Sequence, residues 1–350
     1  MKLDPCIPTS LQARRSVRFR MSALVCLLVL FALPLNRLEA QSSTDGPSPS
    51  YPELKLAGFL QQHFVLDQTS GSPARFSIYR ARLGVTGSIT DRVRVNLIGG
   101  YVEPPDRTPR LVNAFIDFDI HPLLQVRTGQ FLLPFGLEGP EVIVFNPAIE
   151  RTTAIRRLNT FAMFRDIGVQ VSGRHSGFSY AVAVVNGSGA NQPEQFNPKD
   201  VLGRLGWSPV DNLAIGVSGH IGQYRPIPSS DAHESRLRAG VDVSYQGDPL
   251  FFRGEYMVRE DGLPGGRSRN MKGAYLLGGY RFSETVETVA RYEFFDPGTS
   301  SDDDSVTGFL MGVNLYVIGN TRLSVNYEIR DDRLNPDLDN VLTLQMQVAL

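Results

Sequence analysis

From about residue 52 to Leu350, apolar and polar residues alternate in one segment after another. The last ten residues show the pattern, because every second residue from Leu342 to Leu350 is apolar and Thr343, Gln345 and Gln347 lie between them. A period of two is typical of a β-strand whose two faces meet different surroundings. We count sixteen such segments, and the sequence therefore predicts a chain built of strands.

The breaks between these segments alternate between short and long. Short breaks of three to five residues lie at 89–92, 120–124, 174–177, 208–212, 246–250, 283–285 and 318–321. The breaks between them are predicted to be nine residues or longer, such as 67–75, 186–199, 222–234 and 331–339. Tight turns at one end and long loops at the other are typical of a transmembrane β-barrel. The predicted fold is therefore all-β, a transmembrane antiparallel β-barrel of sixteen strands.

The connection at residues 131–165, between the fifth and sixth strands, is exceptionally long. Its apolar residues, among them 142–145, need burial, and a wide barrel offers its inner wall for that purpose. We expect this long third loop to fold into the lumen and narrow it, with 142–145 packed against the wall. The alternative is a cap over the outer mouth.

The first residues are typical of a segment that directs export. In residues 1–40, basic side chains precede an apolar run at 23–35, and Ala40 offers a small residue at a cleavage site, as in a secretory signal peptide. Either Met1 or Met21 fits as the start. Residues 41–51 form a polar lead-in that we expect to be flexible, and residues 52–350 form the predicted barrel.

The charge of the chain does not favour nucleic acid as a partner. Cleavage after Ala40 removes both cysteines and leaves 29 basic and 34 acidic residues, a net charge of −5. Only Lys55, Lys199 and Lys272 of these basic residues are lysines. Arginine is the better bidentate partner for phosphate and carboxylate, although a GC-rich genome would produce the same bias.

The alternation assigns the arginines to the lumen. In the second strand it places Tyr79, Ala81, Leu83 and Val85 toward lipid, where an arginine near the midplane would cost about 2–4 kcal/mol. The arginines predicted to line the pore are Arg80, Arg82, Arg94, Arg127, Arg204, Arg236, Arg238, Arg253 and Arg291. Those predicted to line the constriction formed by the long connection are Arg151, Arg156, Arg157 and Arg165.

Acidic residues share the inward positions and leave the ion selectivity open. The acids expected to face the lumen are Asp117, Asp119, Asp242, Glu255, Glu293 and Glu328. Pairs such as Arg291 with Glu293, or Arg253 with Glu255, would stiffen the wall without favouring anions. Anion preference remains the leading interpretation, because a lumen rich in guanidinium groups concentrates anions.

No pattern in the sequence favours an enzyme, a metal site or a cofactor. None of the five histidines stands near a serine or an acid at the spacing of a catalytic triad, and no histidine pair has the spacing of a zinc site. The acidic run at 302–304 lacks the spaced ligands of a calcium loop. We expect no catalysis and no cofactor.

Several short stretches carry a resemblance to a known family. They are RARLGVTG at 80–87, GQFLLPFGLE at 129–138, RDIGVQVSG at 165–173, VVNG at 184–187, GRLGWSP at 203–209, GEY at 254–256 and ARYEFFD at 290–296. Together, in this order and over nearly the whole mature chain, they resemble the phosphate-selective porin O and P family. The resemblance implies a homotrimeric outer-membrane porin with an inward third loop and an arginine ladder, whose partners are outer-membrane lipid and small anionic solutes.

Two departures from the family bear on this expectation. Phosphate specificity in the family relies on lysines at the constriction, whereas this chain has no lysine between Lys55 and Lys199, and its last residue is Leu350 rather than phenylalanine. The leading expectation from the resemblance is a passive channel that favours small anions such as phosphate, and the missing lysines weaken the specific match to phosphate. The alternative is an outer-membrane barrel with a closed lumen that serves as a surface binding or structural protein.

Overall fold

A computed structural model describes residues 50–69, 71–101, 108–159, 161–194, 198–225, 233–298, 304–333 and 340–350. Within these ranges the strands are β1 (Glu53–Asp67), β2 (Arg75–Ser88), β3 (Val93–Tyr101), β4 (Pro109–His121), β5 (Leu124–Leu132), β6 (Arg165–His175), β7 (Phe178–Val185), β8 (Asp200–Val210), β9 (Leu213–Tyr224), β10 (Glu234–Gln246), β11 (Leu250–Leu263), β12 (Arg267–Arg281), β13 (Val286–Asp296), β14 (Val306–Tyr316), β15 (Thr321–Asp332) and β16 (Val341–Ala349). The helical turns are η1 (Ile143–Phe145), α2 (Thr153–Leu158) and η2 (Ala162–Phe164). The predicted signal peptide and most of the predicted lead-in lie outside the described ranges.

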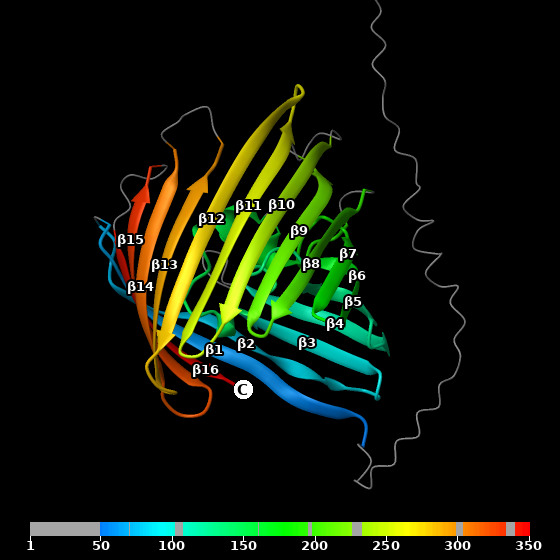
Figure 1. The fold of residues 1–350 in the computed structure, drawn as a ribbon, viewed down its shortest axis with the longest axis horizontal. Helices are drawn as coiled ribbons and strands as arrows, with labels where there is room; N and C mark the ends of the chain where they lie inside the picture. The colour runs from blue at the N-terminus through cyan, green and yellow to red at the C-terminus, as the bar shows by residue number, and fades with distance from the viewer. Residues whose placement is uncertain are drawn as a thin grey trace, which may run out of the picture. The chain divides into compact units, whose positions relative to one another are not determined.

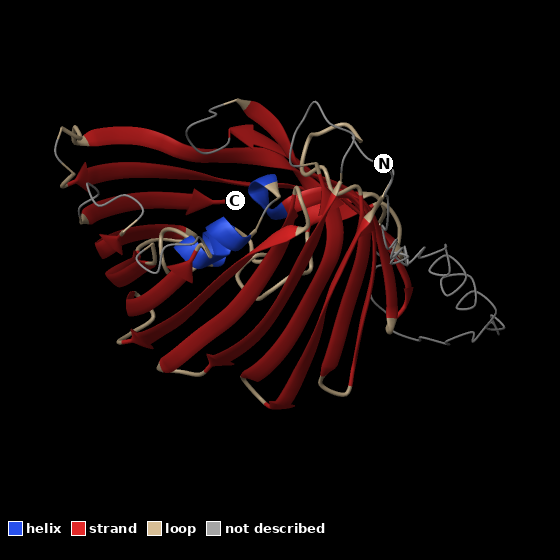
Figure 2. Cartoon of the chain, turned by 90° about the horizontal axis from the view of Figure 1, so that it is seen from above, coloured by secondary structure: helices blue, strands red, loops and turns tan. Residues whose placement is uncertain are grey.

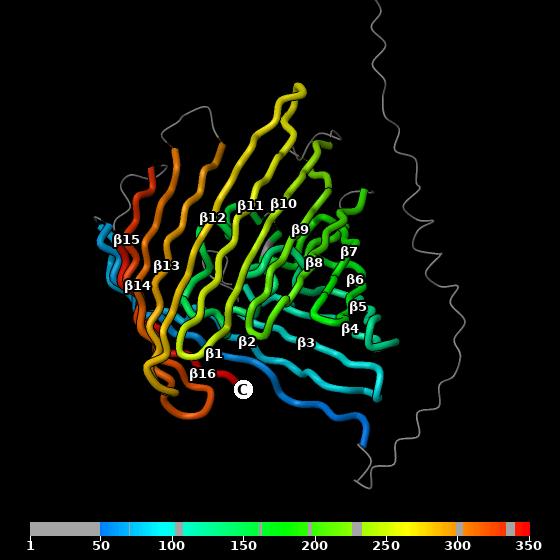
Figure 3. The backbone as a smooth tube through the Cα atoms, viewed as in Figure 1, coloured from blue at the N-terminus to red at the C-terminus, as the bar shows by residue number. Residues whose placement is uncertain are grey.

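The sixteen described strands close into one antiparallel barrel. Each strand pairs with its neighbours in the chain, and β1 pairs with β16 to complete the ring (Figures 1 and 3). Each of the seven predicted short breaks coincides with a turn between consecutive strands. No helix of the described residues is long and apolar enough to cross a membrane.

The two faces of the wall differ as the alternation predicts. Leu83, Val241 and Leu276 point outward and are 59%, 53% and 59% exposed, whereas Arg80 is 1% exposed on the inner face. An apolar outer face with a polar inner face is typical of a barrel that lipid surrounds and whose interior is polar.

One predicted orientation, that of Tyr79, is wrong. The pairing of β1 with β2 shifts between Gln61, which pairs with Arg80, and Gln62, which pairs with Ile78. The resulting bulge turns Tyr79 inward, and its ring stacks on His63 with 4.1 Å between the ring centroids. Ile78 takes the outward position and is 55% exposed. A bulge inserts one extra residue into a strand, so the alternation alone does not reveal it.

The predicted rule that every second connection is long fails most clearly between β11 and β12. These strands pair up to Leu263 and Arg267, which leaves only residues 264–266 as the turn. Gly265 and Gly266 adopt φ values of 86° and 75°, which glycine tolerates at no steric cost. Their hairpin extends beyond the neighbouring strands in Figure 1. The glycines thus convert a predicted loop into longer strands.

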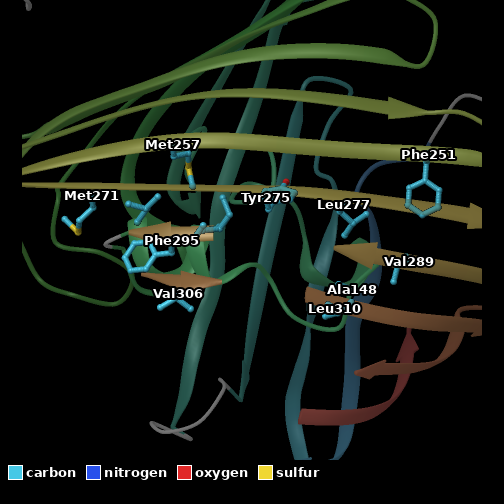
Figure 4. Packing of buried hydrophobic residues seen from close by; sticks show 13 residues of the cluster. Ala148, Phe251, Met257, Met271, Tyr275, Leu277, Val289, Phe295, Val306 and Leu310 are labelled. Carbon is cyan, nitrogen blue, oxygen red and sulfur yellow. The ribbon is translucent and has the colours of Figure 1, made fainter. Parts of the chain in front are cut away.

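The connection between β5 and β6, residues 133–164, carries all three helical turns, which Figure 2 shows within the ring of strands. Ala154, Ile155 and Leu158 of α2 belong to one hydrophobic cluster with inner-face residues of β11 to β14 (Figure 4). Because apolar area is removed from water, this cluster favours the docking of α2 on the wall.

The prediction that residues 142–145 pack together against the wall is wrong in part. Ile143 is 1% exposed, but Val142 is 36% and Phe145 is 73% exposed. These residues form the 3₁₀ turn η1 and its cap. With three residues per turn, successive side chains point in different directions, so Ile143 is buried while Val142 and Phe145 are exposed.

Candidate functional site: the charged lumen

Wall arginines at the turn end of the barrel hold the middle of the connection. Arg253 on β11 pairs with Glu141 at 2.7 Å and donates a hydrogen bond to the side-chain oxygen of Asn146 at 2.6 Å. Arg322 on β15 donates to the main-chain carbonyl of Asn146 at 2.9 Å. Arg253 and Arg322 are 3% and 4% exposed. These two guanidinium groups are buried, and both bind the connection through their Nη atoms.

Glu150 is held from two further strands. One Nη of Arg80 on β2 lies 2.9 Å and 3.2 Å from the two carboxylate oxygens of Glu150. Arg291 on β13 donates to the Glu150 carbonyl at 2.6 Å and pairs with Glu293 at 3.2 Å, as the sequence predicts for that pair. The side chain of Arg80 is 1% exposed and that of Glu150 is 22% exposed. The carboxylate therefore separates Arg80 from water.

Carboxylates of the wall hold main-chain N–H groups of the connection. Glu255 on β11 accepts hydrogen bonds from the N–H groups of Leu137 at 3.1 Å and Glu138 at 3.3 Å. The two oxygens of Glu293 accept from the N–H of Thr153 at 3.1 Å and 3.2 Å. The predicted pairing of Glu255 with Arg253 is therefore wrong, because the connection supplies a partner to each of them. Bonds between a charged acceptor and a main-chain N–H are stronger than neutral ones.

Two arginines predicted for the constriction stabilise the fold of the connection. Arg151 donates to the carbonyl of Glu138 at 3.1 Å, and its guanidinium lies 4.5 Å from the centre of the Phe164 ring. Arg165, at the start of β6, donates to Asn113 at 2.8 Å. Arg151 is 8% and Arg165 is 3% exposed. Neither guanidinium presents much surface to a passing solute.

Arg236 and Arg238 on β10 lie among aromatic rings. Their guanidinium carbons are 5.6 Å and 5.2 Å from the centre of the Phe161 ring. Arg236 is 3.8 Å from Asp200, which is also within 2.8 Å of the His220 ring nitrogen. His220, Arg238 and Phe161 line a small pocket between the connection and the wall. Both arginines are buried, at 7% and 3% exposure.

Arg94 on β3, Arg127 on β5 and Arg204 on β8, by contrast, present their charge to water. Arg127 pairs with Asp117 at 2.7 Å, and the exposed fractions of their side chains are 23% and 7%. Arg94, 47% exposed, lies within 4.0 Å of the same carboxylate. Arg204 on β8 donates to Asp242 at 3.1 Å, and their side chains are 20% and 1% exposed. In each pair the carboxylate is more buried than the guanidinium.

Arg82 lies between these two groups of arginines in exposure. Its guanidinium carbon is 5.1 Å from the centre of the Phe59 ring, and the residue is 9% exposed. Its position on β2 is inward, as the alternation predicts.

Arg156 and Arg157 on α2 are the two predicted constriction arginines that are exposed. Desolvation by the surrounding protein lowers the pKa of Arg156, but the carboxylates of Glu150, Glu328 and Glu293 raise it by more, so the pKa lies above its ordinary value. The surroundings of α2 therefore combine both signs of charge.

Sequence reasoning overlooked the polar contacts that β14 and β15 make with the connection. The side-chain oxygen of Asn326 accepts from the N–H of Ile149 at 2.8 Å, and Asn314 donates to the carbonyl of Pro147 at 2.9 Å. The inward series Arg322, Ser324 and Asn326 alternates with apolar residues and is the signal that could have identified them.

The described part of the chain offers no arrangement for a metal. It contains no group of three or more histidine, cysteine, aspartate or glutamate side chains placed to hold a metal ion. What the inner wall does offer is charge and hydrogen-bonding capacity along a polar interior.

Solved structures with the same fold are outer-membrane proteins. A loop-deletion mutant of OmpT from Vibrio cholerae is 12% identical, with a TM-score of 0.66 over 85% of this chain and 99% of that one. OmpT itself, in its trimer form, is 12% identical with a TM-score of 0.64 over 85% and 99%. An anion-selective porin from Comamonas acidovorans is also 12% identical, with a TM-score of 0.64 over the same shares. At this identity the similarity establishes the fold.

Sequence comparison identifies the family. No curated protein matches the chain. The model of the family described as phosphate-selective porin O and P matches residues 55–275, which include β2 to β11 and the whole long connection. The chain belongs to the phosphate-selective porin O and P family.

Proposed function

We propose that the protein is a passive diffusion channel of the outer membrane that favours small anions such as phosphate. The observation that carries this proposal is the unequal exposure of paired charges on β3 to β8, where Arg127 and Arg204 are 23% and 20% exposed above carboxylates that are 7% and 1% exposed. A solute meets the guanidinium before the carboxylate, so the water-facing surface attracts anions although the pairs are neutral in sum.

The connection between β5 and β6 narrows the channel in this proposal. Its contacts with the inner faces of β2, β11, β13, β14 and β15 support a position inside the barrel. The free lumen then runs between α2 and the β3 to β8 half of the wall. Arg156 and Arg157 of α2 are the groups of the connection that a passing anion meets.

We further propose that residues 1–40 form a cleaved export signal and that the mature chain assembles as a homotrimer in the outer membrane. Membership of the porin family and the fold shared with a trimeric outer-membrane protein support both statements. Outer-membrane lipid contacts the apolar outer face, and a channel of this kind needs no catalytic group.

The reversal potential of the purified protein in a planar bilayer under a potassium chloride gradient tests the selectivity. We expect stable stepwise conductance and a reversal potential with the sign of an anion-selective pore. A reversal potential of the opposite sign would contradict the anion preference. Absence of conductance at every voltage would instead favour a closed barrel that binds a partner at its surface.

A further inference from the structure

The carboxylate of Glu150 occupies a position that is built for an anion. It faces Arg80, whose guanidinium also donates to the side-chain oxygen of Gln61 at 2.8 Å and lies 4.5 Å from the centre of the Tyr79 ring. Gln61 is 0% and Arg80 is 1% exposed, so this cradle belongs to the buried wall. The Glu150 side chain, at 22% exposure, connects the cradle with water.

We propose that Glu150 is a tethered anion in a solute-binding site formed at Arg80, and that a small oxyanion such as inorganic phosphate binds there in competition with it. This inference rests on the proposed channel function. Arg80 contributes the hydrogen bonds that the Glu150 carboxylate now accepts. Gln61 remains bound to the Arg80 guanidinium at 2.8 Å and holds it in place when the anion exchanges.

The Glu150 carboxylate is needed because the charge of Arg80 must be balanced when no solute is bound. A buried guanidinium without a counter-charge is strongly unfavourable, so a vacated cradle would recruit an anion from solution. A bound solute that could not leave would block the channel, because conduction requires binding that is weak enough for release. Glu150 is attached to the wall through its carbonyl by Arg291, so its carboxylate remains close by and returns when the solute moves on.

The test is the block of chloride current by inorganic phosphate in the wild-type protein and in E150Q. Glutamine keeps the size of the side chain and removes its charge. We expect the phosphate concentration that halves the chloride current to fall about tenfold in E150Q, the equivalent of one charge-assisted interaction. Sensitivity equal to that of the wild type would overturn the proposal.

Two variants make the result specific. E141Q changes another carboxylate of the connection that pairs with a wall arginine, but Arg253 keeps Asn146 at 2.6 Å and Glu138 at 3.6 Å as partners, so we expect wild-type sensitivity. In R80Q/E150Q both charges of the pair are absent, so the tighter block should disappear. Equal tightening in E141Q and E150Q, or persistence in the double variant, would contradict the assignment to Arg80.

A different result would contradict the proposed function. A cation-selective reversal potential of the wild-type channel would contradict anion preference, whatever phosphate does. An anion-selective wild type whose block by phosphate is unchanged in E150Q would contradict the tethered anion alone.

Discussion

The two halves of the barrel wall use the same residue types for different purposes. Four inward arginines, Arg80, Arg253, Arg291 and Arg322, are at most 4% exposed and bind the connection between β5 and β6. On β3 to β8, Arg94, Arg127 and Arg204 bind carboxylates of the wall itself and keep 20–47% of their side chains in water. The number of inward arginines is therefore a poor measure of anion attraction. Their exposure relative to their partners is a better one.

The difference has a physical origin in the length of the connection. The connection at residues 133–164 places main-chain N–H and carbonyl groups against the wall that no strand pairing satisfies. Such groups are costly to bury without hydrogen-bond partners. The charged side chains of one half satisfy them, as Glu255 does for Leu137 and Glu138. In the opposite half, Arg94, Arg127 and Arg204 pair instead with carboxylates of the wall and keep part of their side chains in water.

Deletion of residues 140–157 should produce the largest effect. It removes η1 and α2, and water would then reach the wall groups that these segments now cover. We expect the single-channel conductance in a planar bilayer to rise roughly severalfold, because conductance follows the open cross-section.

External trypsin gives an independent check of the same point. Arg156 and Arg157 should resist cleavage in intact cells if the connection lies inside the barrel. Rapid cleavage there, together with unchanged conductance after the deletion, would make the connection an outer cap and leave selectivity to the wall.

Replacement of one arginine from each half should distinguish the two roles, because the two variants should lose different amounts of unfolding free energy. R253Q leaves Glu138 and Glu141 near a buried site without their charge partner, so we expect a loss of about 3–5 kcal/mol in urea-induced unfolding in detergent. R94Q removes a guanidinium that is 47% exposed, and its cost should stay within about 1 kcal/mol. Similar losses in both variants would show that the halves do not differ in this way.

The sequence was sufficient to predict the strands and their order. A barrel wall repeats one local rule, so all seven short turns and the inward placement of Arg80, Arg127, Arg253 and Arg291 follow from alternation. The same rule failed where one residue breaks the period, as at Tyr79, or where two glycines permit a tight turn, as between β11 and β12.

The alternation could not predict all the partners of the inward charges. Arg291 and Glu293 are two residues apart and share one face of β13, so their pairing is local and was predicted. Arg253 instead meets Glu141, which is 112 positions away along the chain. Such a contact depends on how a long connection docks, and the periodicity of the strands carries no information about it.

Charge reversal at the exposed arginines of α2 should give the smallest of these effects. R156E/R157E changes charge on the surface of the connection that faces water, without removing a partner of any buried carboxylate in hydrogen-bond contact. We expect the anion-to-cation permeability ratio to fall about two- to threefold at unchanged conductance.

R267E/R269E makes the same change in charge on the exposed β11–β12 hairpin, away from the connection. Because a wider part of the channel screens its wall charges more effectively, this control should shift the ratio less. Equal shifts in the two variants would mean that α2 does not border the narrowest part of the channel, and the comparison between the two halves would then concern stability alone.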